Sequence, residues 1–150
     1  LDYLTADDEL KVVDLTTTTQ IPAADTVTNG EEVLGFQQLV RMIPVAESVG
    51  RYAVELVRST RPGVNGGGPD FIKKYVNFGA SVRAAQFLVL AGKVRALMHG
   101  RFHVSYEDVR ALAIPILRHR VLLNFHAESE RLTSDELLRQ LLDWKRAPRE

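Results

Sequence analysis

The chain has 150 residues, 45% of them hydrophobic and 25% charged, which is the balance of an ordinary globular domain. Its 19 Lys and Arg residues equal its 19 Asp and Glu residues, and this net charge of zero argues against a chain-wide electrostatic footprint for nucleic acid. The lack of cysteine excludes disulfides and cysteine-ligated zinc, and no apolar run is long enough for a membrane span.

The first elements are a helix and a linker. Segment 5–15 begins with Thr5 as an N-cap residue and has Asp8 three residues later, a spacing that predicts a helix start. Residues 16–30 are polar and β-branched and contain a proline and a glycine, which is typical of a linker.

Two helices with apolar stripes are predicted next. Thr28 and Glu31 have capping-box spacing, and the helix after them runs through Ile43. Its stripe consists of Val33, Phe36, Leu39, Val40 and Ile43. Pro44 interrupts this helix, and we expect helix to resume at once. The second stripe consists of Val45, Val49, Tyr52, Ala53, Leu56 and Val57.

A glycine-rich loop separates these helices from the next one. Residues 61–70 cannot hold regular structure. The helix after Ser81 ends near Gly100, a natural C-terminal signal. One face of this helix is predicted to carry Ala84, Phe87, Leu88, Ala91, Val94 and Met98.

The last third of the chain is also helical. Ser105 and Asp108 cap a helix that reaches about Leu117, although Pro115 disturbs its last turn. Periodicity cannot decide whether 120–125 is extended or helical. Thr133 and Glu136 open a final helix. The chain is therefore predicted to be all-α, a small bundle of about six helices with short extended links.

Few residues suggest chemistry of their own. The loop 63–69 lacks the Gly-Lys-Ser/Thr ending of a phosphate-binding loop, so a surface connection is the simpler interpretation. The pair His99 and His103 has no acidic residue to complete a ligand set, and we expect no metal site. His119 lies between two arginines, which favours a structural hydrogen bond or an interface.

Arg83 is the residue that calls for an explanation. It lies in the first turn of its helix, where the backbone dipole is already positive and a carboxylate would be more favourable. Its guanidinium can extend past the helix start and match the oxygens of a phosphate delivered there. The alternative is a solvated or ion-paired surface arginine.

Three groups of residues form an ordered series of motifs. The first consists of Gly79, Ala80, Ser81, Arg83 and Ala84. The second consists of Val104, Ser105, Glu107, Asp108 and Val109, and the third of Leu117, Arg118, His119 and Arg120. This series resembles the C-terminal helical lid of MoxR-type AAA+ ATPases over nearly the whole chain, and segment 56–61 also resembles the family's helix end before the loop. The resemblance implies that residues 1–24 join an absent nucleotide-binding core to a helical lid formed by 25–150.

The resemblance also implies a role for Arg83. In this family the arginine of the first motif is the second sensor, which reaches ATP held by the core, and Ser81 would lie on the same phosphate side. Val82 departs from the family, which usually has proline at this first helical position. The departure leaves the chemistry of Arg83 intact but makes the start of the helix less rigid.

The sequence has neither a phosphate-binding GxxxxGK[ST] motif nor an acidic strand for magnesium, so we do not expect this chain to hydrolyse ATP by itself. ATP would be the cofactor, with Mg²⁺ bound by the absent core, and we expect no cofactor to bind tightly to this chain alone. The implied partners are that core, neighbouring subunits of a hexameric ring and a von Willebrand A-domain protein, with a cytoplasmic location. The alternatives are a small helical DNA-binding module, with 104–120 as a recognition helix, or a peptide-binding scaffold.

Overall fold

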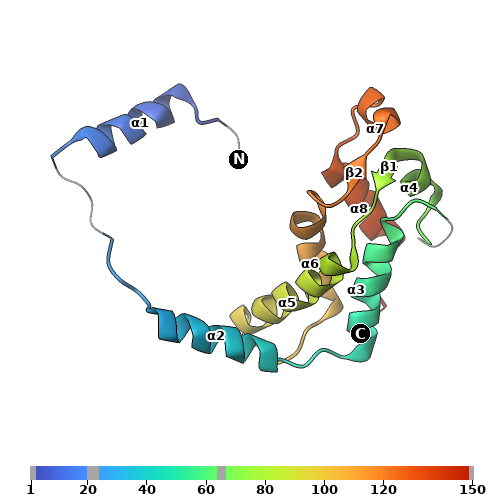
Figure 1. Ribbon diagram of the computed structural model, residues 1–150, viewed down its shortest axis with the longest axis horizontal. Helices are drawn as coiled ribbons and strands as arrows, with labels where there is room; N and C mark the ends of the chain where they lie inside the picture. Colours follow the sequence, from blue (N-terminus) through green and yellow to red (C-terminus); the bar gives the residue numbers. More distant parts are fainter. Residues whose placement is uncertain (1–2, 20–23, 64–66, 149–150) are drawn as a thin grey trace. The chain divides into compact units, whose positions relative to one another are not determined.

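The computed structural model describes residues 3–19, 24–63 and 67–148. Within them the chain forms eight helices and one two-stranded sheet (Figure 1). The elements are α1 (Ala6–Thr17), α2 (Gly30–Met42), α3 (Glu47–Ser59), α4 (Asp70–Tyr75), β1 (Val76–Phe78), α5 (Val82–Met98), α6 (Tyr106–Leu117), β2 (Leu122–Leu123), α7 (Phe125–Ser129) and α8 (Ser134–Trp144). The all-α prediction is confirmed. The count of about six was too low because α4 and α7 are too short to leave a periodic apolar pattern.

The chain divides into two compact units, Leu1–Leu34 and Gly35–Glu150. In the first unit Thr5 is the N-cap of α1, and its hydroxyl accepts from the backbone N–H of Asp8 at 3.4 Å, as predicted. No side chain of α1 is buried among the described residues. The functional boundary after residue 24 remains a prediction.

Helix α2 forms where predicted, but two details were wrong. Its cap is Asn29, whose side chain accepts from the N–H of Glu32 at 2.9 Å while the Glu32 carboxylate accepts from the N–H of Asn29 at 3.3 Å. The pair is therefore one residue beyond the predicted Thr28 and Glu31, because asparagine is the better cap. The predicted stripe is not buried within α2 either, and only Ile43, just past the helix, enters the core.

The core of the second unit lies among α3, α5, α6 and α8, which pack side by side (Figure 1). Helix α3 begins at Glu47, so Pro44 stops the preceding helix for longer than predicted. Its predicted stripe is otherwise confirmed, since Val49, Tyr52, Ala53, Leu56 and Val57 are all buried. Each of the four helices contributes a fully buried leucine; these are Leu56, Leu88, Leu117 and Leu141.

The predicted end of α5 at Gly100 is confirmed. Gly100 has a φ of 67°, the left-handed conformation that favours glycine. The N–H of Gly100 donates to the carbonyl of Leu97, and that of Arg101 donates to the carbonyl of Ala96, both at 2.9 Å. These two bonds form a Schellman motif, and they turn the chain so that Arg101 follows the helix directly.

A buried carboxylate joins the end of α5 to the start of α6. Asp108 is fully buried, and its oxygens accept from Arg95 at 2.6 Å and from Arg101 at 2.6 and 2.7 Å. Asp108 also completes the predicted capping box with Ser105. Burial acts to raise the pKa of Asp108, but the hydrogen bonds from Arg101, Ser105 and Arg95 outweigh it and hold the pKa well below its usual range.

The remaining elements of the second unit include a short two-stranded sheet and the start of α8. Strands β1 and β2 pair antiparallel, with Val76 opposite Leu123, so the undecided segment 120–125 contains a short strand. The capping box of Thr133 and Glu136 is confirmed at the start of α8. None of the helices among the described residues is both long and apolar enough to cross a membrane.

Candidate functional site

The first turn of α5 presents Arg83 to solvent without a counter-charge. Arg83 is exposed, and no carboxylate pairs with it in the part of the chain that the structure describes. The first turn contains no acidic residue, and the side chain of the N-cap residue Ser81 makes no capping bond. The free N–H groups of the helix start and the guanidinium therefore add to one positive region.

The end of α3 fixes the turn that leads to Arg83. The N–H of Ala80 donates to the hydroxyl of Thr60 at 2.9 Å, and the carbonyl of Ala80 accepts from Nε of Arg61 at 2.9 Å. Thr60 is fully buried, and its hydroxyl donates to the carbonyl of Val57 at 2.7 Å. Both backbone polar groups of Ala80 are thus held, which fixes the start of α5 against α3.

Gly79 is required by this close approach. A Cβ at this position would lie 2.4 Å from the carbonyl oxygen of Thr60 and 2.6 Å from Cα of Arg61. The Gly79-Ala80-Ser81 motif therefore has a structural reason, namely that the turn lies directly on the backbone of the helix end. Sequence reasoning did not find the roles of Thr60 and Arg61, because nothing in one sequence links them to a turn about twenty residues later.

The predicted apolar face of α5 was partly wrong. Phe87 is 42% exposed and Met98 is 80% exposed, and Val94 is also exposed. The buried face instead consists of Ala84, Ala85, Leu88, Gly92 and Ala96. Apart from Leu88 this face is made of small residues, and the turn before α6 comes very close to it, since a Cβ at Gly92 would lie 2.9 Å from a methyl group of Val104. Arg83 consequently lies on an exposed face, one turn before Phe87.

The third motif, at the end of α6, has two different uses. Arg118 pairs with Asp135 of α8 at 2.8 Å, which is a structural contact between helices. Arg120 places its guanidinium carbon 5.1 Å from the centre of the Phe87 ring. Nη1 of Arg120 donates to the carbonyl of Ile116 at 2.5 Å and contacts His119. The predicted hydrogen-bonding role of His119 is therefore realised toward its neighbouring arginine.

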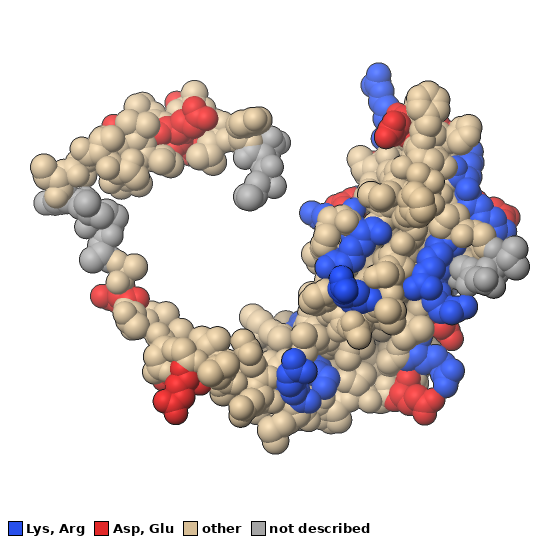
Figure 2. All heavy atoms as spheres, in the orientation of Figure 1, with Lys and Arg blue, Asp and Glu red and all other residues tan. Residues whose placement is uncertain are grey.

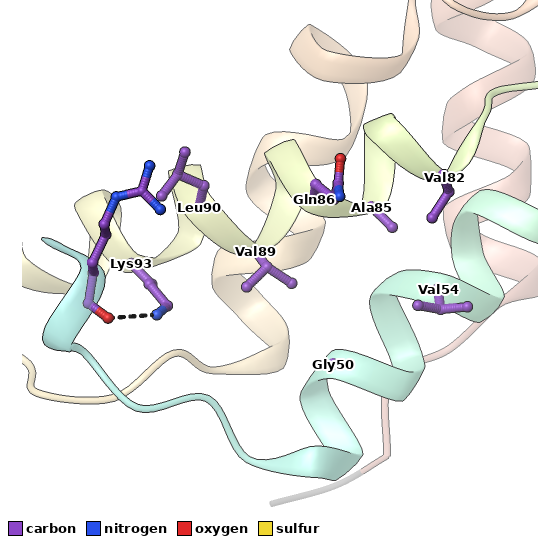
Figure 3. A pocket seen from close by; sticks show the side chains of 9 residues that line it. Gly50, Val54, Val82, Ala85, Gln86, Val89, Leu90 and Lys93 are labelled. Carbon is purple, nitrogen blue, oxygen red and sulfur yellow. Dashed lines mark hydrogen bonds between the residues drawn. The ribbon is translucent and has the colours of Figure 1, made fainter. Parts of the chain in front are cut away.

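A second feature is an open groove between α3 and α5, with a volume of about 670 Å³ (Figure 3). Val54 faces Val82, Ala85 and Val89 across it, which makes the walls apolar. At one end Nζ of Lys93 donates to the carbonyl of Arg41 at 3.0 Å. The volume lies in the range of ligand pockets, and the groove gives the peptide-binding alternative a location.

The histidines form no metal-binding group among the described residues. No group of three or more His, Asp or Glu residues that could hold a metal lies among residues 3–19, 24–63 and 67–148. Nδ1 of His99 contacts the carbonyl of Arg95 at 2.8 Å. Part of the loop 63–69, residues 64–66, lies outside the described residues.

Two arginines of segment 104–120, the recognition helix of the DNA-binding alternative, are used in internal contacts. Nη1 of Arg110 donates to the carbonyls of Leu142 at 2.9 Å and Lys145 at 3.0 Å. Arg118 is paired with Asp135. These bonds direct both side chains to α8 and its end, whereas a DNA-binding helix directs its arginines to phosphates and bases.

Comparisons with known proteins agree with the motif series. Residues 71–141 match the AAA lid domain family. The chain is 29% identical over 121 residues to the chaperone MoxR1 of Mycobacterium tuberculosis, covering 81% of this chain and 32% of that protein. It is 26% identical over 149 residues to the uncharacterised protein YeaC of Bacillus subtilis, covering 99% of this chain and 43% of that one.

A solved structure gives the same result for the fold. A candidate ATPase from Cytophaga hutchinsonii superposes with a TM-score of 0.82 at 28% identity, over 100% of this chain and 45% of that one. The chain thus spans less than half the length of each of these relatives.

Proposed function

Since this chain belongs to the lid domains of MoxR-like AAA+ ATPases, we propose that Arg83 is the second sensor of such an ATPase and contacts the phosphates of ATP held by the core domain. The observation that carries the proposal is the unpaired, exposed guanidinium at an uncapped helix start on a turn fixed by α3. An arginine in that position gains most when an anion is brought to it.

The donors present here fit a phosphate chain. Arg83 has a planar fork that matches phosphate oxygens, and Ser81 can add a hydroxyl because its side chain is not used for capping. Val82 occupies the first helical position of α5, so replacement of the family's proline leaves Arg83 in the first turn. When bound, ATP supplies the phosphoryl group that the ATPase hydrolyses, while this chain supplies only cationic contacts to it.

The turn before α5 would couple the nucleotide state of the core domain to the rest of the lid. The Thr60 hydroxyl and the Arg61 side chain connect that turn to α3. Because α3, α5, α6 and α8 share one core, a force on the turn moves the lid as one body. In the parent ATPase this motion would act on neighbouring ring subunits, and it would serve chaperone-like remodelling of client proteins with a von Willebrand A-domain partner.

The test is steady-state ATP hydrolysis by the complete ATPase that carries this lid. Arg83→Ala should lower turnover about ten- to a hundredfold if its bonds strengthen in the transition state. Arg83→Lys should restore only part of the activity, because a point charge does not replace the bidentate fork. Arg139→Ala is the control, since Arg139 is an exposed cation of α8 with only a 3.8 Å contact to Asp135.

Melting temperatures measured in parallel show whether a loss of turnover comes from lost phosphate contacts or from unfolding of the lid. Arg83 is exposed, so its removal should change the melting temperature little. Wild-type turnover and unchanged ATP affinity in Arg83→Ala would contradict the proposal.

A further inference from the structure

Arg120 is the second arginine near the start of α5 that has no carboxylate partner in the described part of the chain. Three arginines of α5, the turn after it and the end of α6 are paired with carboxylates: Arg95 and Arg101 bind Asp108, and Arg118 binds Asp135. Arg120 differs, because its partners are an aromatic ring, a carbonyl and a histidine. These partners orient the guanidinium without cancelling its charge.

The Phe87 ring brings Arg120 toward Arg83. Residues four apart on a helix are neighbours on one face, so Phe87 lies next to Arg83. Side chains on a helix lean toward its N-terminus, and the Phe87 ring therefore covers the turn that carries Arg83. The Arg120 guanidinium carbon lies 5.1 Å from the centre of that ring, so Phe87 neighbours Arg83 along the helix and Arg120 across it. Helix α6 packs against α5, and Figure 2 shows several groups of blue Lys and Arg atoms on the visible face of the second unit.

We propose that Arg120 and Arg83 together form a two-guanidinium site for the polyphosphate chain of a nucleotide, with Phe87 as the platform that orients Arg120. The proposal rests on the proposed function for the identity of the anion, and it adds Arg120 as a second contact to it. Two like charges held on one face repel each other, and a multivalent anion removes that repulsion.

The chemistry of the site selects phosphate oxygens. Each guanidinium offers a planar set of donors, and two of them can hold adjacent phosphates of one chain, whereas a single carboxylate fills only one fork. Beside the ring an open pocket of about 440 Å³ is lined mainly by apolar side chains, together with His119 and Arg120. Its apolar walls lower the local competition from water for the charged contacts.

The first experiment measures anion binding by the 150-residue chain and does not depend on ATPase activity. Inorganic tripolyphosphate is titrated at low ionic strength, with isothermal calorimetry and the guanidinium Nε–H NMR signals of Arg83 and Arg120 as readouts. Both signals should shift with the same dissociation constant. Arg120→Gln and Arg83→Ala should each weaken binding roughly tenfold. ATP should bind with comparable affinity, and acetate should not bind.

Variants separate a contact from a structural role. Arg120→Gln keeps a donor for the Ile116 carbonyl and should retain the wild-type melting temperature, while Arg120→Lys should keep part of the affinity. Phe87→Leu keeps an apolar side chain but removes the ring face, so it should weaken tripolyphosphate binding in the same direction as Arg120→Gln. Arg139→Ala removes one exposed positive charge elsewhere and should bind as the wild type does.

The outcomes distinguish this proposal from the second-sensor assignment. If Arg120→Gln binds tripolyphosphate as the wild type does, the two-guanidinium site is refuted, even when Arg83→Ala abolishes ATP hydrolysis in the complete ATPase. If both arginines are needed for tripolyphosphate binding but Arg83→Ala leaves hydrolysis unchanged, the anion site stands and the second-sensor assignment fails. Equal losses for Arg139→Ala and Arg120→Gln would reduce the binding to general electrostatic attraction and also refute the site.

Discussion

Replacing Asp108 with asparagine tests whether α5 and α6 are joined by a buried charge or only by packing. Asp108 is fully buried and binds the guanidinium groups of Arg95 and Arg101, whose side chains are 25% and 31% exposed. Asp108→Asn keeps the size of the side chain and an oxygen that can accept from Ser105. It removes the negative charge and leaves two partly buried cations facing each other.

The magnitude follows from this arrangement. Removing one partner of a buried ion pair costs about 3–5 kcal/mol, and the partial exposure of both arginines places this case near about 3 kcal/mol. For a chain of this length each kcal/mol lowers the melting temperature by about 2–4 °C, so the variant should melt about 6–12 °C below the wild type. Mutations at an exposed pair change stability by less than about 1 kcal/mol.

The buried carboxylate of Asp108 also predicts how the free energy of unfolding depends on pH. The pKa of Asp108 in the folded state lies below its unfolded value of about 3.9, so ionisation stabilises the fold at every pH above about 4. This contribution is lost as the pH falls from there toward the lower folded-state pKa. The difference in unfolding free energy between wild type and Asp108→Asn should therefore be constant from about pH 8 to pH 5 and shrink below about pH 4.

Urea unfolding followed by circular dichroism at several pH values measures both effects. The matched control is Asp135→Asn, which removes the same charge from the surface pair with Arg118, where the Asp135 side chain is 29% exposed. If Asp108→Asn were no more destabilising than Asp135→Asn at pH 7, the buried charge would contribute nothing beyond a surface pair. A difference that persisted unchanged at pH 2 would instead assign the effect to side-chain packing.

Four further substitutions test how the start of α5 and the helices are built. Gly79→Ala should destabilise the chain by about 1–3 kcal/mol and weaken tripolyphosphate binding, because its Cβ would meet backbone 2.4 Å away. Gly50→Ala, whose Cβ meets nothing within 4 Å, should be neutral or stabilising by the same urea unfolding assay. Thr60→Val leaves the buried N–H of Ala80 without its acceptor and should cost about 1–3 kcal/mol, whereas an unchanged urea midpoint would show that the bond is dispensable. Thr133→Ala removes the cap of α8 and should cost about 1 kcal/mol with a loss of helical signal on mild heating.

Local signals in the sequence predicted most of the helices correctly. The capping residues Thr5, Ser105 and Thr133 act through bonds to residues three positions away, so each is visible in a short window. The stripe of α3 is equally local, because 3.6-residue spacing alone determines which side chains share a face. The missed cap at Asn29 is an error of one position within the same kind of signal.

The buried face of α5 could not be predicted in the same way. This helix has apolar residues on nearly all sides, so periodicity favours no single face. The close approach of α6 decides which face of α5 is buried. The small residues Ala84 and Gly92 lie on the buried face, and the larger Phe87 is exposed. Only the tertiary structure contains that information. The same is true of Arg120, whose position over the Phe87 ring joins the third motif to a part of α5 that is far from it in the sequence.

The polar contacts that join α5 to α3 and α6 lie at its two ends, and this arrangement suits a helix whose first turn carries the proposed anion-binding residue Arg83. At the first end, bonds from Thr60 and Arg61 fix the turn before Arg83 to α3. At the other end, Asp108 fixes the last turn to α6. Between them the helix packs through small residues, which allow close contact but supply little shape to resist sliding along the axis. The polar contacts at the two ends therefore set the axial position of α5. A force applied at Arg83 would be transmitted to α3 and α6.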